Sequence, residues 1–193
     1  MAETSQLTEE NARLGFISVL GSVKTGLVGG LLIIDRLGHP KEFHCTVPVC
    51  PNPAQEILYG ASLQAFLYGR HIADALLRKT SLDCFAIMTN SPYVLSLQTV
   101  TPKPVMMLFP SGSPIAEGFS ACDPETLKGL RTDDWVELPP DALHTDRLAV
   151  LKTIWGDPDR RGRIKTGLEM YVGNVDLAEP FDRITMAIQE SQK

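Results

Sequence analysis

The stretch Gly26-Leu-Val-Gly-Gly-Leu-Leu-Ile-Ile-Asp35 decides the fold that this sequence predicts. It is a continuous apolar run, rich in branched residues and short enough for one strand. Because the run is apolar throughout rather than alternating, we expect both of its faces to be covered, as in a central strand. A turn at Asp35–Gly38 follows, in which Gly38 can adopt the positive φ that closes a hairpin with a bulge.

A second strand is predicted at Lys41–Val47, where the side chains alternate with a period of two. Its apolar residues share one face, which we expect to be buried: Phe43, Cys45 and Val47. Its polar residues share the other face, which we expect to be wet or to line a pocket: Glu42, His44 and Thr46. The two strands together form a hairpin.

A long helical segment is predicted after this hairpin. Pro51 and Pro53 end the sheet, since proline cannot donate to a strand ladder. Asn52 is a good N-cap, with Pro53 at the first helical position and Gln55 placed for a capping box. Gly60 breaks a short first helix. Ser62 can cap a second helical piece, in a stretch that ends at Thr80, with an apolar stripe at helical spacing formed by Phe66, Gly69, Ala73, Leu76 and Leu77.

Further strands are expected on both sides of this unit, at Leu14–Leu20, Asp83–Met88, Tyr93–Thr99 and Pro104–Phe109. Short connections favour antiparallel neighbours. The sequence therefore predicts an α+β fold: a single mixed or mostly antiparallel sheet at about residues 14–109, with one long helix packed on a face.

The remainder is predicted as a mainly helical C-terminal part of one domain that spans residues 1–193. Residues 111–193 form either an extension or a small second unit, with a short helix at Asp123–Lys128, a short strand at Trp135–Leu138, a helix at 157–172 and a final helix that follows a capping box at Asp176–Glu179. Residues 147–155 fit a strand or a helix equally well. Residues 1–12 are expected to be disordered or frayed.

Composition restricts the partners of this 193-residue chain. Its formal net charge of −5 argues against non-specific nucleic-acid binding and against docking on an anionic membrane. No stretch approaches the roughly 20 apolar residues that span a bilayer, and the N-terminus lacks the regions of a signal peptide. We therefore expect a cytoplasmic protein whose partner is another protein or a second copy of itself, with nucleic acid unlikely and no membrane.

Glu42 and His44 are the best candidates for a polar site. They lie two residues apart on one strand face, so they could form an acid-base pair or part of a ligand pocket. A solvated or cross-strand polar pair is the simpler interpretation. Glu56 and Tyr59 would border the same pocket if the start of the helix lies over that strand.

The cysteines allow a thiol or metal site at Cys45 and Cys50. His44 and Cys45 are neighbours on a strand and point to opposite faces, so the imidazole is poorly placed to activate the thiol. A zinc site usually shows two close pairs of ligands, whereas Cys84 and Cys122 are isolated. We expect no metal and no cofactor.

Two further motifs favour simple structural roles. Gly21–Gly26 contains Lys-Thr after a strand, but in the wrong order for a phosphate-binding loop, so a hairpin loop is expected. The basic cluster at Arg160–Lys165 has no interleaved aromatic residue on which bases could stack, which favours a solvated helix face.

No catalytic arrangement stands out, so the leading functional prediction is a non-catalytic binding, regulatory or assembly module. The alternatives are a small-molecule enzyme that uses Glu42 and His44, and a thiol or metal site at Cys45 and Cys50. The sequence leaves open whether the protein is an enzyme.

Overall fold

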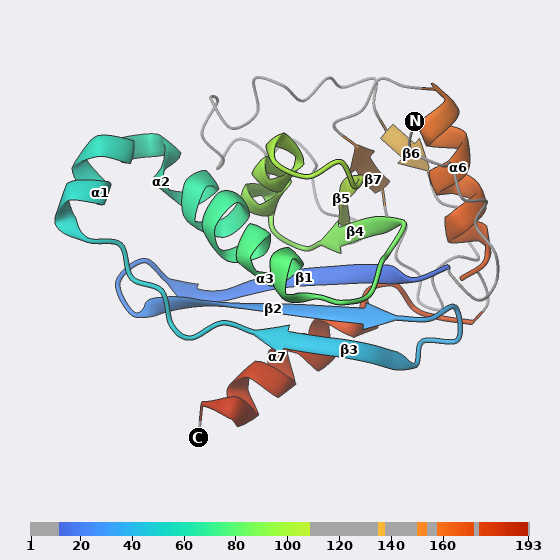
Figure 1. Cartoon of the computed structure of the whole chain (residues 1–193), viewed down its shortest axis with the longest axis horizontal. Coiled ribbons are helices and arrows are strands. Elements are labelled where there is room, and N and C mark those ends of the chain that lie inside the picture. The colour runs from blue at the N-terminus through green and yellow to red at the C-terminus, as the bar shows by residue number, and fades with distance from the viewer. Residues whose placement is uncertain (1–11, 109–134, 138–149, 154–157, 172–173, 193) are drawn as a thin grey trace.

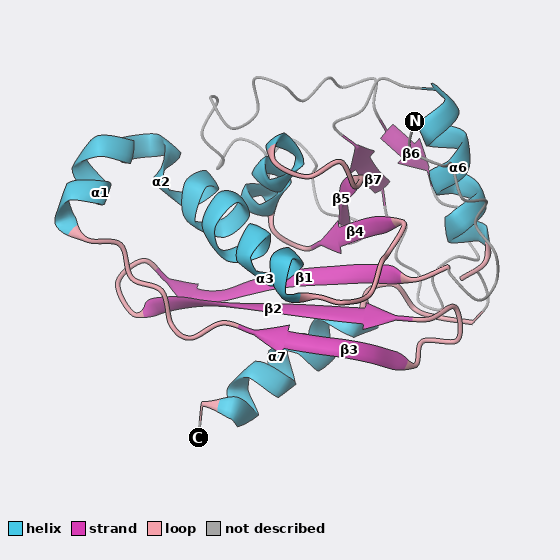
Figure 2. Cartoon of the chain, viewed as in Figure 1, coloured by secondary structure: helices cyan, strands magenta, loops and turns pink. Residues whose placement is uncertain are grey.

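The strands of this protein form one open, mixed sheet, seen in a computed structural model that describes residues 12–108, 135–137, 150–153, 158–171 and 174–192 (Figure 1). The strand order is β3-β2-β1-β4-β5-β7-β6. Helices cover both faces of the sheet, as the colouring by secondary structure shows (Figure 2). The predicted α+β fold, with a mixed sheet and a long helical segment on one face, is confirmed.

The first three strands form an antiparallel meander: β1 (Leu14–Ser22), β2 (Gly26–Ile34) and β3 (Pro40–Cys45). Every residue of β2 is buried, as its continuous apolar sequence predicts. The link between β1 and β2 is a tight hairpin in which Gly21 and Gly26 have positive φ, and Ser22 and Thr25 hydrogen bond to each other.

The second half of the sheet begins with two strands parallel to β1, namely β4 (Ala86–Thr89) and β5 (Val105–Leu108). Two antiparallel strands continue it, β7 (Val150–Thr153) and then β6 (Trp135–Glu137). The ambiguous segment at residues 147–155 therefore contains a strand.

One face of the sheet is covered by the connection from β3 to β4. It runs through α1 (Pro53–Tyr59), η1 (Gly60–Ser62), α2 (Leu63–Ala65), the π-helix η2 (Phe66–Ala73) and α3 (Asp74–Lys79). Asn52 caps α1 with the predicted capping box, in which its side chain accepts from the Gln55 amide and the Gln55 side chain accepts from the Asn52 amide. The 3₁₀-helix η3 (Pro92–Thr99) packs against η2 on the same face.

The other face is covered by α6 (Pro158–Glu169) and α7 (Glu179–Ser191). Two adjacent glycines of β2 let helices approach from both sides. A Cβ on Gly29 would lie 3.0 Å from Leu76, and one on Gly30 would lie 2.5 Å from Ile184 of α7. Because successive strand residues face opposite sides of the sheet, the missing side chain of Gly29 leaves room for one helical layer and that of Gly30 leaves room for the other.

The strand predicted at Tyr93–Thr99 is wrong, because this segment forms the helix η3. Pro92 occupies its first turn, where proline's fixed φ suits a helix. The hydroxyl of Ser96 donates to the carbonyl of Ala65, at 2.6 Å, and to that of Tyr93, at 2.8 Å. The bond to Ala65 fastens η3 to α2 and makes the segment part of the helical layer.

The burial predicted for the strand at Lys41–Val47 is also wrong. Phe43 is 38% exposed, Val47 is 78% exposed and Cys45 is exposed. β3 is the edge strand, and α7 lies against β1 and β2. The polar face of β3, which contains the half-buried Glu42 and His44, instead lies toward α3.

Several predictions fall partly or wholly outside the described residues. These are the frayed segment 1–12, apart from Ala12, and the short helix at Asp123–Lys128. Whether residues 111–193 are an extension or a second unit stays a prediction. Within the part of the chain that the structure describes, no helix has the length and apolar character needed to cross a membrane.

Candidate functional site

Glu42 and His44 do meet, as the alternation of β3 predicts. The Nε2 atom of His44 lies 2.6 Å from Oε1 of Glu42. The same carboxylate also accepts hydrogen bonds from the start of the loop that follows α3. Thr80 donates its hydroxyl at 2.6 Å, and the backbone amides of Ser81 and Leu82 donate at 3.1 Å each.

These bonds make Glu42 a clamp between the edge strand and the end of α3. The hydrogen bond from Thr80, followed by that from His44, lowers the pKa of Glu42 from 4.5 to about 2. A carboxylate with such a low pKa is a weak base near neutral pH. These contacts therefore give Glu42 a structural role, which is to connect β3 to the loop that follows α3.

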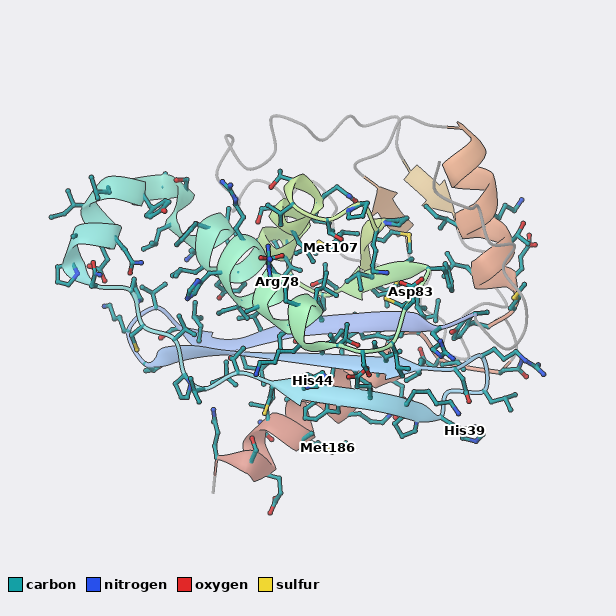
Figure 3. The ribbon with its side chains drawn as sticks, in the orientation of Figure 1. His39, His44, Arg78, Asp83, Met107 and Met186 are labelled. Carbon is teal, nitrogen blue, oxygen red and sulfur yellow. The ribbon has the colours of Figure 1, made fainter. Side chains whose placement is uncertain are left out.

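Glu56 and Tyr59 belong to α1, which lies at the end of the molecule to which the helical segment projects (Figure 1). His44 lies on β3, beside α3 (Figure 3). Glu56 is exposed, and Tyr59 stacks on Phe66 rather than on β3. Whether any of the four residues faces a ligand stays a prediction.

The thiols are dispersed. Cys45 and Cys50 are free and exposed, and Cys84 is free and buried, where burial raises its pKa to about 11. Cys122 lies outside the described residues. Among the described side chains, no group of three or more His, Cys, Asp or Glu could hold a metal ion.

The carboxyl ends of β1 and β4 form a topological switch point. The two strands are parallel neighbours, with Ile17 beside Thr89. The chain leaves β1 toward β2 on one side, and leaves β4 toward β5 on the other. Ligands of open α/β sheets bind outside the carboxyl ends of strands at such a reversal. Both strands point to the end of the sheet from which α1 and α2 project (Figure 1).

A buried serine and an exposed asparagine meet at this switch point. The hydroxyl of Ser18, which is 1% exposed, donates to Oδ1 of Asn90 at 3.1 Å. Ser18 and Thr89 are the two buried polar residues in the described part of the chain. Buried hydroxyls need hydrogen bonds, and here the bond orients an amide that is itself open to solvent.

Aromatic side chains gather on the helical segment at the same end of the sheet. The rings of Tyr59 and Phe66 are stacked with centroids 4.1 Å apart and planes 16° apart. The ring of His71 continues the stack, 6.0 Å from Phe66 and at 17° to it. We refer to Tyr59, Phe66 and His71 as the ring tier. Tyr59 and Phe66 are half-buried and His71 is exposed.

The π-helix η2 holds this tier against the body of the protein. Gly69 lies so close to η3 that a Cβ there would lie 2.7 Å from the amide nitrogen of Leu97. Tyr68 of η2 packs on Tyr93, which follows β4, with ring centroids 5.4 Å apart. π-Helical turns are rare and are often found at functional sites.

Sequence reasoning missed both the Ser18–Asn90 pair and the ring tier. The pair joins residues 72 positions apart, which only the parallel contact between β1 and β4 brings together. The ring tier depends on the π-helical geometry of η2, and the periodicity of the sequence does not predict a π-helix.

Comparisons with known proteins give a structural likeness only, since no family model and no curated protein matches the chain. Human ENDOV is similar with a TM-score of 0.40 and 12% identity, covering 94% of this chain and 86% of that one. A variant of Ciona intestinalis Endonuclease V, in complex with a 23mer DNA containing an inosine followed by a ribo-adenosine, has a TM-score of 0.39 and 11% identity, covering 81% and 76%. Ciona intestinalis Endonuclease V with a 24mer DNA of the same kind has a TM-score of 0.37 and 11% identity, covering 80% and 77%.

These findings contradict two predictions from the sequence. The similar structures are endonucleases, and two of them are complexes with DNA. The prediction of a non-catalytic module, with its two alternatives, and the prediction that nucleic acid is an unlikely partner are therefore withdrawn. Because the TM-scores are below 0.5, the likeness assigns no activity to this chain. Any function has to be argued from its own residues.

Proposed function

We propose that this protein binds single-stranded nucleic acid by stacking bases on the ring tier. The observation that carries the proposal is the stack of Tyr59, Phe66 and His71 on α1 and η2, which is incompletely covered by the rest of the described chain. Unpaired bases stack on aromatic side chains whatever their sequence, because every base has a π-face. Only single strands offer such faces freely.

The residues around the ring tier favour a single-stranded nucleic acid that binds mainly by base stacking. Ile57 and Leu58 of α1 are 82% and 81% exposed and extend the apolar surface beside Tyr59. Arg70 is exposed next to His71 and can meet a phosphate. The net charge of −5 leaves little general attraction for phosphates. We therefore expect affinity to fall only weakly with salt, with a log–log slope of roughly 1 or 2.

Fluorescence anisotropy with end-labelled dT12, used alone and annealed to dA12 as a duplex, tests the proposal. We expect the wild-type protein to bind the single strand and to prefer it over the duplex form. Stacking on one aromatic ring contributes about 1–3 kcal/mol per base. His71→Ala and Tyr59→Leu, which remove the rings at the two ends of the stack, should each weaken binding by about 5-fold or more. His71 is exposed, so its variant keeps the packing of the core.

Phe43→Leu is the matched control, since it removes an equally aromatic side chain from an exposed position on β3. It should leave the affinity unchanged. Urea unfolding of all three variants separates loss of binding from loss of fold. Absence of binding by the wild-type protein, or equal weakening by Phe43→Leu, would overturn the proposal.

A cytoplasmic setting belongs to the same proposal. It is supported by the free and exposed thiols of Cys45 and Cys50, which a reducing compartment would preserve. Alkylation at the moment of cell lysis should modify both thiols. A disulfide-linked fraction in that experiment would argue for an oxidising compartment instead.

A further inference from the structure

We infer that Asn90 donates its side-chain amide hydrogens to an acceptor oxygen of the bound strand, and that Ser18 orients the amide for this contact. The inference rests on the proposed function, since it names a second point of contact for the same ligand. It comes from a different observation, which is the hydrogen bond between Ser18 and Asn90 at the switch point.

The bond fixes which end of the amide faces outward. Oδ1 of Asn90 accepts the Ser18 hydroxyl, so Nδ2 is the end that is left for a ligand. None of the described residues accepts a hydrogen bond from that Nδ2. Asn90 is exposed, so its two N–H donors are available to a molecule in solution.

Burial of Ser18 makes this orientation hard to lose. Turning the amide over would place Nδ2 against the buried hydroxyl, and Ser18 would have to act as an acceptor instead of a donor. Ser18 is paired across the sheet with Gly30, whose face is filled by α7, so the serine is held tightly. It is therefore a positioning residue for Asn90.

The pair and the ring tier are linked through the tyrosines. Tyr93 comes three residues after Asn90 and packs on Tyr68 of η2, the helix that carries Phe66 and His71. A nucleic-acid strand whose bases stack on the tier has to pass around the end of the sheet to reach Asn90, because Ser18 shares the face that α7 fills whereas η2 covers the opposite face. Asparagine side chains contact both phosphate oxygens and base edges in protein–nucleic acid complexes.

Binding of labelled dT12 and dA12 to Asn90 variants tests the inference. Asn90→Ala removes the donors and should weaken binding about 5-fold. Asn90→Asp replaces the donors by a carboxylate that can only accept and repels phosphate, so it should weaken binding further and recover as the pH is lowered. Equal losses for the two oligonucleotides identify a phosphate oxygen as the acceptor, whereas a loss confined to dT12 identifies a base carbonyl.

Ser18→Ala adds a test of positioning. In the wild-type protein the side-chain ¹⁵N–¹H signals of Asn90 should shift when dT12 is added. In Ser18→Ala they should move even without dT12, and binding should fall toward that of Asn90→Ala while the urea midpoint shows that the fold is retained.

The two proposals fail differently. Wild-type protein that binds neither oligonucleotide would overturn the proposed function and this inference with it. Wild-type affinity in both Asn90 variants, while His71→Ala binds poorly, would overturn the role of Asn90 alone.

Discussion

Replacing Gly69 by alanine should destabilise the protein, although alanine is the better helix former. The added Cβ would press on Ser96 Oγ and lie 2.7 Å from the backbone nitrogen of Leu97. Backbone cannot move aside as a flexible side chain can, so η2 and η3 would have to separate. Overpacking of this kind costs about 1–3 kcal/mol.

Two smaller effects nearly cancel. Separation would weaken the hydrogen bond from Ser96 to the carbonyl of Ala65, which contributes about 1 kcal/mol. Alanine in place of glycine favours the helix by about 1 kcal/mol. The net expectation for Gly69→Ala is a loss of about 1–3 kcal/mol. With a urea m-value of roughly 2 kcal/mol/M, the unfolding midpoint should fall by about 0.5–1.5 M.

Gly162→Ala is the matched control for this experiment. Gly162 lies in α6, and none of the described residues comes within 4 Å of the position its Cβ would take. The same substitution should there raise the free energy of unfolding by about 1 kcal/mol. Urea titrations followed by circular dichroism measure both. A Gly69→Ala midpoint at or above that of the wild-type protein would refute the close packing of η2 on η3.

Two further predictions concern buried or clamped polar groups. Because the folded state lowers the pKa of Glu42 to about 2, the hydrogen bonds to its carboxylate should stabilise the protein above pH 4.5 and lose this contribution as the pH falls toward 2. The difference in Tm between the wild-type protein and Glu42→Gln should therefore shrink over that pH range. A constant difference in Tm would contradict the prediction. Tyr171→Phe removes a buried hydroxyl that donates to the carbonyl of Ala12 at 2.9 Å and lies 3.3 Å from the carbonyl of Ile34. The free energy of unfolding, measured by urea titration, should therefore fall by about 1–2 kcal/mol. An unchanged unfolding midpoint would contradict these hydrogen bonds.

Local signals in the sequence predicted much of the fold. The apolar run of Gly26–Ile34 forms a fully buried strand because no polar side chain interrupts it. Asn52 caps α1 because its partner Gln55 is only three residues away. Such features depend on neighbours along the chain, so the sequence contains all that is needed to find them.

The errors arose where distant segments decide the outcome. Alternation correctly placed Phe43 and Cys45 on one face of β3, but which face is covered depends on where α7 packs. Likewise, the short apolar segment Tyr93–Thr99 is a helix because it docks on η2. The contact between Ser18 and Asn90 depends on strand order, which the sequence left undecided between mixed and antiparallel.

The π-helical form of η2 has a consequence for how the length of this protein can vary. A π-helical turn contains one residue more than an α-helical turn, so loss of a single residue between Phe66 and Ala73 could be absorbed by a return to ordinary α-helix. The hydrophobic layer over the sheet would survive such a deletion, and the upstream residues, including Tyr59, would keep their direction about the helix axis, because the π-helical turn is what accommodates the extra residue. Natural variants one residue shorter in this segment would therefore keep the architecture and, where Phe66 and His71 remain, the stack of rings.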